Sequence, residues 1–269
     1  MKTHNAYIQR TKPHLFRCND LLYGKIKRKL AAVKGNTMKK GYIYAPQMTL
    51  FGNKEIIGFG TDDFYVKEMK RVEANKIIIK NHYSGKVYSA TYIHLGVYAE
   101  GGLLGVMQFG YAMNPASMAS VVSGTGIKEY LELNRMWFKD GLFKNIKSQS
   151  MALAIKFIKG KHRNIKWIQS FADERCNKYG IVYQACNFLY CGEHKATFWE
   201  LSGTWYHNSL MTRNPKLSKS AAYIQKHKDK AKPEVLRQFR YLYFIKRNEI
   251  KNLLLNIEPP PKHYAVEQS

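Results

Sequence analysis

The sequence predicts a mixed α/β fold in which a central sheet is flanked by helices. Strand-like and helix-like segments alternate between residues 64 and 190, and this order favours a sheet with crossover connections. Hydrophobic residues make up 45% of the 269 residues, which supplies enough apolar surface for a large core. No window approaches the roughly 18 uninterrupted apolar residues that a membrane-spanning helix needs, so we expect no membrane span.

The first half of this region contains one predicted helix and three predicted strands. Apolar residues recur at helical spacing over 64–81, which predicts a helix that stops before Gly85. Residues 91–98 and 103–111 are β-rich, and the Gly-Gly turn between them predicts a hairpin. After a loop rich in Ser and Gly, residues 129–138 predict a further strand.

The second half continues the alternation. A polar loop leads into a predicted helix at 148–159, whose apolar residues have helical spacing. Residues 165–171 then predict a buried strand. Residues 181–190 predict a helix followed by a short strand. The order of these elements indicates one α/β domain over residues 41–210.

Both ends of the chain are predicted to be basic and helical. Residues 19–33 form the helical part of a basic N-terminal arm at 1–40. A basic helical extension covers 211–269, in which 233–255 predict a long helix because Pro233 suits a first helical turn.

The charge of the chain is concentrated at these ends. The formal net charge is +25, of which residues 1–40 carry +10, 41–210 carry +7 and 211–269 carry +8. Lys and Arg that neutralise phosphates release counterions, so we expect a nucleic acid as partner. Charge does not distinguish DNA from RNA, and an excess this large disfavours a role in solubility alone.

A strand–loop–helix unit at 131–159 is the first candidate site. Free N–H groups and the helix dipole make a helix N-terminus an anion site. Asn145, Ser148 and Ser150 are candidate caps or phosphate contacts, with Arg135 or Lys144 assisting. The alternative is ordinary helix capping. No P-loop or GxGxxG motif occurs in the sequence.

Candidate catalytic groups follow the buried strand and the first helix. Asp173 lies in a polar run where the strand ends, a common position for active-site residues, although a turn fits equally well. Tyr183 and Asn187 share one face of the predicted helix, and the phenol is a candidate general acid or a core side chain. His82 is a candidate base or metal ligand, with an ordinary surface or core histidine as the alternative.

The cysteines and the N-terminal residues indicate the cellular compartment. The four cysteines form neither a CxxC pair nor a disulfide framework, so we expect no metal site and reduced thiols. The N-terminus has no apolar run, so we expect no signal peptide. These features favour a cytoplasmic location.

Long motifs give the chain a family resemblance. Four of them are residues 92–111 (YIHLGVYAEGGLLGVMQFGY), 129–137 (EYLELNRMW), 167–176 (WIQSFADERC) and 182–194 (VYQACNFLYCGEH). In combination they resemble the Mom proteins, bacteriophage enzymes that convert adenine in DNA to carbamoylmethyladenine and so protect phage DNA from restriction. The resemblance covers about residues 65–210 and implies action in the cytoplasm of the host cell.

The resemblance also implies a fold and a set of site residues. Mom proteins are similar to GNAT-type acyltransferases, which bind acyl-CoA at the loop after the fourth strand. The loop at 139–150 departs from the usual acyltransferase pattern because it supplies only one glycine, Gly141, where the pattern has two. The family residues fall on His82, Arg135, Ser148 or Ser150, and Tyr183.

A target amine stacked inside a duplex requires the base to be flipped, which costs about a few kcal/mol. Since the amine is a poor nucleophile, we expect His82 or Asp173 as the base. The product carries a CH2 on the adenine nitrogen, so we infer glycyl transfer followed by internal attack and rearrangement. We expect the donor to be acyl-CoA or a glycyl donor such as aminoacyl-tRNA. A reaction that depends on iron is the less favoured alternative.

Two other functions remain open from the sequence. One is a DNA-binding protein on a degenerate acyltransferase scaffold, which the incomplete glycine loop favours. The other is an N-acetyltransferase that acts on a different amine, which leaves the charge of +25 unexplained.

Overall fold

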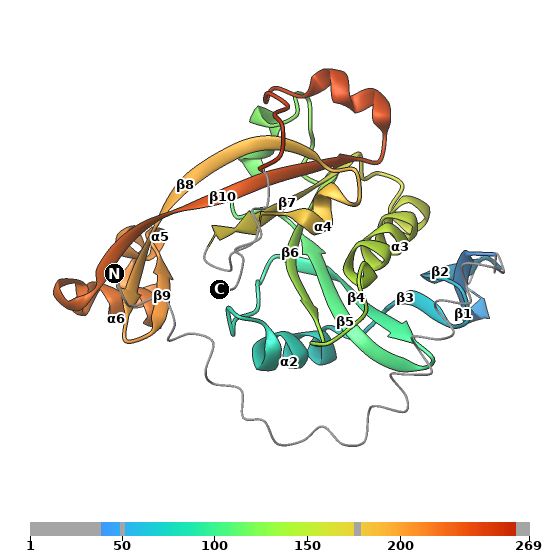
Figure 1. Cartoon of the computed structure of the whole chain (residues 1–269), viewed down its shortest axis with the longest axis horizontal. Helices are drawn as coiled ribbons and strands as arrows, with labels where there is room; N and C mark the ends of the chain where they lie inside the picture. The colour runs from blue at the N-terminus through green and yellow to red at the C-terminus, as the bar shows by residue number, and fades with distance from the viewer. Residues whose placement is uncertain (1–38, 49–51, 175–178, 262–269) are drawn as a thin grey trace, which may run out of the picture.

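The computed structural model describes residues 39–48, 52–174 and 179–261, and its strands form one ten-stranded sheet (Figure 1). The spatial order is β1-β2-β3-β4-β5-β6-β7-β10-β8-β9. The strands are β1 Gly41–Met48, β2 Lys54–Gly60, β3 Phe64–Glu68, β4 Thr91–Ala99, β5 Gly102–Gly110, β6 Tyr130–Phe138, β7 Trp167–Asp173, β8 Leu189–Leu201, β9 Thr204–His207 and β10 Lys232–Phe244. This sheet confirms the predicted mixed α/β class.

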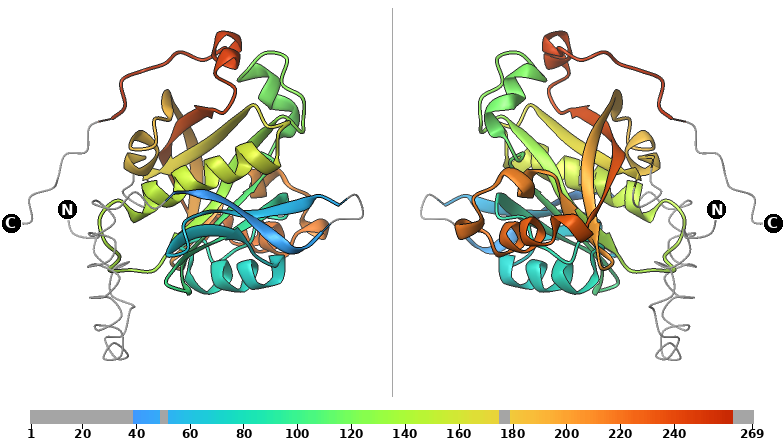
Figure 2. Two further views of the ribbon diagram at one scale, coloured as in Figure 1. Left: turned by 90° about the vertical axis from the view of Figure 1, so that its right-hand side faces the viewer. Right: turned by 90° about the vertical axis from the view of Figure 1, so that its left-hand side faces the viewer.

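Helices cover both faces of the sheet. The α-helices are α2 Arg71–Asn81, α3 Ile146–Lys161, α4 Ile181–Gln184, α5 Ser209–Thr212 and α6 Lys219–Lys226. Short 3₁₀ turns occur at η1 Pro115–Ser120, η3 Pro215–Leu217, η4 Lys228–Lys230 and η5 Arg247–Asn252. Ala74 and Ile78 of α2 pack on Val106 of β5. The apolar side of α3 packs on the opposite face, where Met107 lies (Figures 1 and 2).

The sheet forks between β6 and β7, its one parallel pair among the described strands. Their pairing covers three residue pairs and ends at Glu132 opposite Gln169. Beyond that point β6 stays paired with β5, and β7 stays paired with β10. The two halves of the sheet therefore separate, and the wedge between them is a place where a ligand can enter.

The far half of the sheet ends in a small lobe. β10 pairs with β7 only from Gln238 onward, whereas its pairing with β8 begins at Lys232, so these two strands continue as a two-stranded arm. Residues 202–232, which we call the satellite lobe, contain β9, α5, α6 and their short connections. Leu201, Ile224 and Ala231 are buried in its core at the end of the arm (Figure 1).

The elements predicted between residues 91 and 171 are confirmed. β4 and β5 form the expected antiparallel hairpin, and β6, α3 and β7 follow in the expected order. The segment at 181–190 is also confirmed as a short helix followed by a strand. The helix predicted at 19–33 and most of the arm at 1–40 lie outside the described residues.

The prediction of one helix over 64–81 is wrong at its start. Residues 64–68 form β3, where Phe64 and Val66 are buried and the side chain between them, Tyr65, stacks on Tyr98 of the next strand. This alternation has the period of a strand. Only Arg71–Asn81 is helical.

The prediction of a helix over 233–255 is also wrong, because residues 232–244 form β10, an interior strand. Pro233 lies on the two-stranded arm, where β10 has only β8 as partner, so its missing N–H breaks no ladder bond on the open side. The run from Arg240 to Phe244 is rich in aromatic residues, which favour strands. The extension at 211–269 is therefore part helix and part sheet.

No helix in the described part of the chain is both long and apolar enough to cross a membrane.

Substitutions in β10 test this correction. Leu242 is fully buried beside Trp167, whereas Val235 is 60% exposed on the arm. A helix would place these two residues, seven apart, on one face, but a strand places them on opposite faces. We expect Leu242→Ala to lower the free energy of unfolding by about 2–5 kcal/mol. Val235→Ala should lower it by less than about 1 kcal/mol. Equal losses in urea titrations would contradict the strand.

Candidate active site

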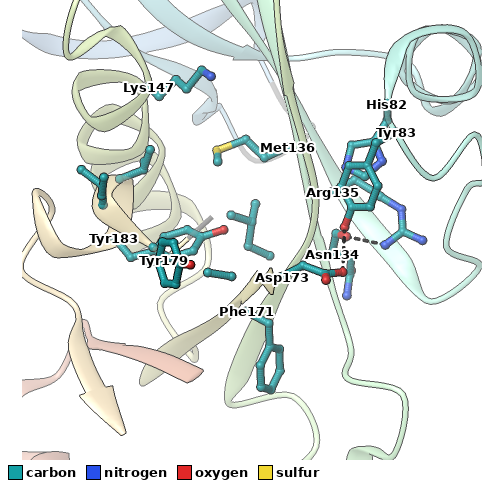
Figure 3. A pocket seen from close by; sticks show the side chains of 15 residues that line it. His82, Tyr83, Asn134, Arg135, Met136, Lys147, Phe171, Asp173, Tyr179 and Tyr183 are labelled. Atoms are coloured by element: carbon teal, nitrogen blue, oxygen red, sulfur yellow. Dashed lines mark hydrogen bonds between the residues drawn. The ribbon is translucent and has the colours of Figure 1, made fainter. Parts of the chain in front are cut away.

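A cavity of about 280 Å³ opens in the fork of the sheet (Figure 3). Its walls come from the diverging ends of β6 and β7, the end of α2, the first turn of α3 and the start of α4. The four residues predicted to be catalytic all line it: His82, Arg135, Asp173 and Tyr183. Segments more than 100 residues apart in the sequence thus meet at one place.

His82 is the residue directly after α2, and its hydrogen bonds fix its tautomer. The backbone N–H of Ser84 donates to His82 Nδ1 at 3.2 Å, and the Ser84 hydroxyl lies 2.9 Å from the same atom. A backbone N–H can only donate, so Nδ1 accepts and the proton of the neutral imidazole is on Nε2. In this arrangement His82 is a hydrogen-bond donor through Nε2.

Tyr83 and Asp173 meet on one side of the cavity, as Figure 3 shows. The Tyr83 hydroxyl donates to Asp173 Oδ2 over 3.5 Å, a long hydrogen bond. Asp173 is 8% exposed, whereas Tyr83 is 53% exposed. The ring of Tyr83 packs on the ring of His82, with the two centroids 4.2 Å apart. The sequence analysis did not select Tyr83; its position next to His82 was the available signal.

Arg135 donates hydrogen bonds to two backbone carbonyls. Its Nε donates to the Lys86 carbonyl at 3.1 Å, and Nη1 donates to the Asn134 carbonyl at 2.7 Å. The guanidinium also lies over the ring of Tyr88, 5.9 Å from its centroid. Arg135 therefore fastens the loop that follows α2 to the end of β6.

Tyr183 lies on the opposite wall, on α4. It is buried and packs against the rings of Phe188 and Tyr241, with centroids 5.6 and 5.4 Å away. Burial raises the pKa of the Tyr183 phenol to about 12, because the phenolate would lose its hydration. The hydroxyl therefore keeps its proton at neutral pH, as a general acid requires.

A buried polar pair marks the point where the sheet divides. Gln169 Nε2 donates to Glu132 Oε2 at 2.6 Å, between the last two paired residues of β6 and β7. The Asn134 amide donates to the other oxygen of Glu132 at 3.2 Å. Burial raises the pKa of Glu132, and these two hydrogen bonds oppose that rise.

The residues predicted to contact the cofactor do not all line the cavity. Asn145 directly precedes α3 with a left-handed φ of 71°, but its side chain makes no capping hydrogen bond. The hydroxyls of Ser148 and Ser150 donate to the carbonyls of Asn145 and Ile146. Ser150 is fully buried within the core face of α3, so its hydroxyl does not reach the cavity.

The structure does not place Asn187 on a helix with Tyr183, so the predicted shared face is wrong. α4 ends at Gln184, and Asn187 lies in the turn before β8 with a left-handed φ of 60°. Its side chain is exposed and is not part of the cavity wall. Lys147, in the first turn of α3, does line the cavity, although the sequence analysis did not select it.

Across the described ranges, no group of three His, Cys, Asp or Glu side chains is arranged to hold a metal ion. Cys186 and Cys191 are buried thiols, and Cys18 and Cys176 lie outside the described residues. Burial raises the pKa of each buried thiol to about 11, so neither is a reactive thiolate at neutral pH.

Sequence comparison identifies the family of this chain. The model of the Mom protein family matches residues 63–262. The chain belongs to the Mom protein family. The methylcarbamoylase Mom of Escherichia phage Mu is 37% identical over 227 residues, which are 83% of this chain and 94% of that protein. The match includes β10 and the satellite lobe as well as the fork.

Solved structures with a similar arrangement are acetyltransferases. The ribosomal-protein-S5-alanine acetyltransferase of Vibrio fischeri aligns with a TM-score of 0.41 at 12% identity and covers 70% of this Mom chain and 96% of its own. A GNAT-family acetyltransferase of Streptococcus pneumoniae aligns with a TM-score of 0.40 at 8% identity and covers 68% and 99%.

The contacts of Arg135 give a prediction for this Mom-family site. Arg135→Lys removes the planar group that spans the two carbonyls, so the loop after α2 should open more often. We expect at least about tenfold faster amide hydrogen exchange in residues 83–88, with a thermal midpoint within about 2 °C of the parent. The exposed Arg163→Lys is the matched control. Unchanged exchange in the loop would show that Arg135 does not hold it.

Proposed function

We propose that this chain modifies adenine in DNA by transferring an acyl group, in the form of a glycyl unit, to the exocyclic amine. Membership of the Mom family and 37% identity to a methylcarbamoylase support this function. Both also make the chain a transferase. The observation that carries the proposal is the cavity in the fork, where a proton acceptor and a proton donor lie on opposite walls.

Asp173 is the proposed general base. It lies at the end of β7 on the cavity wall, and its Oδ2 accepts a hydrogen bond from Tyr83. His82 is less suited to this role, because its Nδ1 lone pair is already bonded to the Ser84 N–H. We assign His82 the role of donor toward the developing oxyanion or the adenine, and Arg135 that of a positioning residue.

Tyr183 is the proposed general acid. Its pKa of about 12 keeps the phenol protonated, so it can give a proton to the leaving group of the donor. In this scheme Asp173 takes the proton of the adenine amine as the new N–C bond forms. The bond between the acyl carbon and the leaving group breaks, and Tyr183 protonates that group.

The connectivity of carbamoylmethyladenine requires a second step. The first transfer joins the adenine amine to the carbonyl of a glycyl unit and leaves the glycyl amine free. That amine then attacks the ring carbon that bears the adenine amine. When the original C–N bond breaks, the former ring amine becomes the terminal amide, and one proton moves from the attacking amine to the departing amide nitrogen.

The first turn of α3 fits the phosphates of an acyl-CoA. The Asn145 side chain does not cap this helix, and Lys147 places a cation on the cavity wall beside it. A helix N-terminus and a neighbouring lysine suit a pyrophosphate. Bound there, acyl-CoA would supply an activated acyl carbon. An aminoacyl-tRNA remains the other proposed donor and would supply the same activated carbonyl.

Iron does not fit the described residues in the same way, since they contain no cluster of three His, Cys, Asp or Glu ligands. No step is therefore assigned to it. The substrate proposed here is duplex DNA in the cytoplasm of a phage-infected cell, with the target base flipped into the cavity and the product protected from restriction.

Two substitutions test the assigned chemistry. Asp173→Asn and Tyr183→Phe keep the shape of each side chain but remove the base and the acid, so modification should fall about 100- to 10,000-fold. The measurement is mass spectrometry of nucleosides from DNA of cells that express each variant. Tyr243→Phe is the matched control, because Tyr243 packs at the margin of the same core.

Two results would contradict the proposal in different ways. If the parent yields no modified adenosine, the proposed function is wrong. If both variants modify DNA as well as the control does, the function stands but the assigned roles are wrong.

The donor is tested by incubating purified protein and unmodified DNA with acetyl-CoA, glycyl-CoA or glycyl-tRNA. We expect the full product only with a glycyl donor, because acetyl transfer supplies no second nitrogen. Full modification with acetyl-CoA alone would contradict the glycyl scheme.

A further inference from the structure

The satellite lobe carries a dense positive charge that the chemistry in the fork does not use. Residues 202–232 contain seven Lys and Arg and a single acid, Asp229. All seven basic side chains are exposed: Arg213, Lys216, Lys219, Lys226, Lys228, Lys230 and Lys232.

A few cations outside the lobe are paired with acids. Lys161 binds Glu55 and Glu68, and Lys166 binds Glu129. In contrast, none of the seven basic residues of the satellite lobe forms a salt bridge with any other described residue. The lobe therefore presents its charge outward, where a polyanion can neutralise it.

Hydrogen bonds within the lobe hold together the elements that carry this charge. Trp199 Nε1 donates to Asn208 Oδ1 at 2.9 Å, and Gln225 Nε2 donates to the carbonyls of Leu210 and Arg213 at 2.7 and 2.8 Å. These bonds tie α5 and α6 to each other and to β8. A surface that is ordered before binding loses less entropy when it meets its ligand.

A short chain of contacts connects the lobe to the cavity. Arg135, on the cavity wall, donates to the carbonyl of Lys86. The ammonium of Lys86 lies 5.3 Å from the ring centroid of Tyr206, which belongs to β9 of the lobe. The lobe therefore borders the loop that forms one rim of the cavity, at the far end of the β8–β10 arm (Figure 1).

We propose that the satellite lobe is a docking surface for the phosphate backbone of duplex DNA that flanks the target adenine. This inference rests on the proposed function. Because Lys86 of the rim loop lies against Tyr206 of the lobe, one duplex segment can touch the cavity rim and the lobe together. A flipped base loses its stacking, and phosphate contacts beside it offset that loss without reading the sequence.

The exposed Leu217 adds to this surface. It is 83% exposed in η3, between the cations Lys216 and Lys219. An apolar side chain among cations is typical of surfaces that enter a DNA groove. Solvated charge alone gives no reason for a leucine at this position.

The test compares two triple variants that lose the same charge. One is Lys216→Gln with Lys219→Gln and Lys226→Gln in the lobe. The matched control is Lys54→Gln with Lys156→Gln and Lys159→Gln, exposed positions on β2 and α3. Binding to a 20-base-pair duplex and to a tRNA is measured by fluorescence anisotropy between 50 and 200 mM salt.

For the lobe variant we expect the slope of log affinity against log salt for the duplex to become shallower by up to about 2.7, and affinity near 150 mM salt to fall at least about tenfold. The control variant should change affinity less than about twofold. Equal slopes for the two variants would overturn the proposal. So would a loss confined to tRNA, which would assign the lobe to RNA.

Nucleoside mass spectrometry on the same variants separates this inference from the proposed function. If the parent produces no modified adenosine but the lobe variant still loses duplex affinity, the docking surface stands and the function fails. If the parent modifies DNA and the lobe variant binds the duplex as the control does, the function stands and the docking surface fails.

Discussion

The site depends on one constraint, the end of parallel pairing between β6 and β7 after Glu132 and Gln169. Each strand continues beyond this point because it has another partner, β5 for β6 and β10 for β7. Two strands that separate leave backbone groups and side chains facing a wedge that neither strand fills. The hydrogen bond between the Glu132 and Gln169 side chains lies at the apex of that wedge. A sheet with full pairing here would have no cavity.

Another wall of the cavity is formed by the residues that follow α2, which ends beside this wedge. α2 ends beside it, so His82 and Tyr83 face Asp173 at the end of β7. Arg135 keeps the loop after α2 in place through the Lys86 carbonyl. Asp173 and Arg135 are thus held by strands of the packed sheet, which position side chains more firmly than loops would.

Much of the fold could be predicted from local patterns, and the failures have physical reasons. The hairpin at β4 and β5 and the helix α3 have clear periodicity, and two of the predicted catalytic residues, His82 and Asp173, lie where an element ends. β10 was mistaken for a helix because Pro233 suits a first helical turn as well as a strand with a single partner, and only tertiary pairing separates the two. Tyr83 was missed because its partner, Asp173, is 90 residues away in the chain.

The position of β10 sets the order in which the protein can be completed during synthesis. Residues 167–173 of β7 are made well before their long antiparallel partner, Gln238–Phe244, which follows the satellite lobe in the chain. Until then β7 has only three parallel pairs with β6, and its other edge is open. Nascent chains therefore contain a template for wrong strand pairing until β10 has been made, because only then does β7 gain its antiparallel partner.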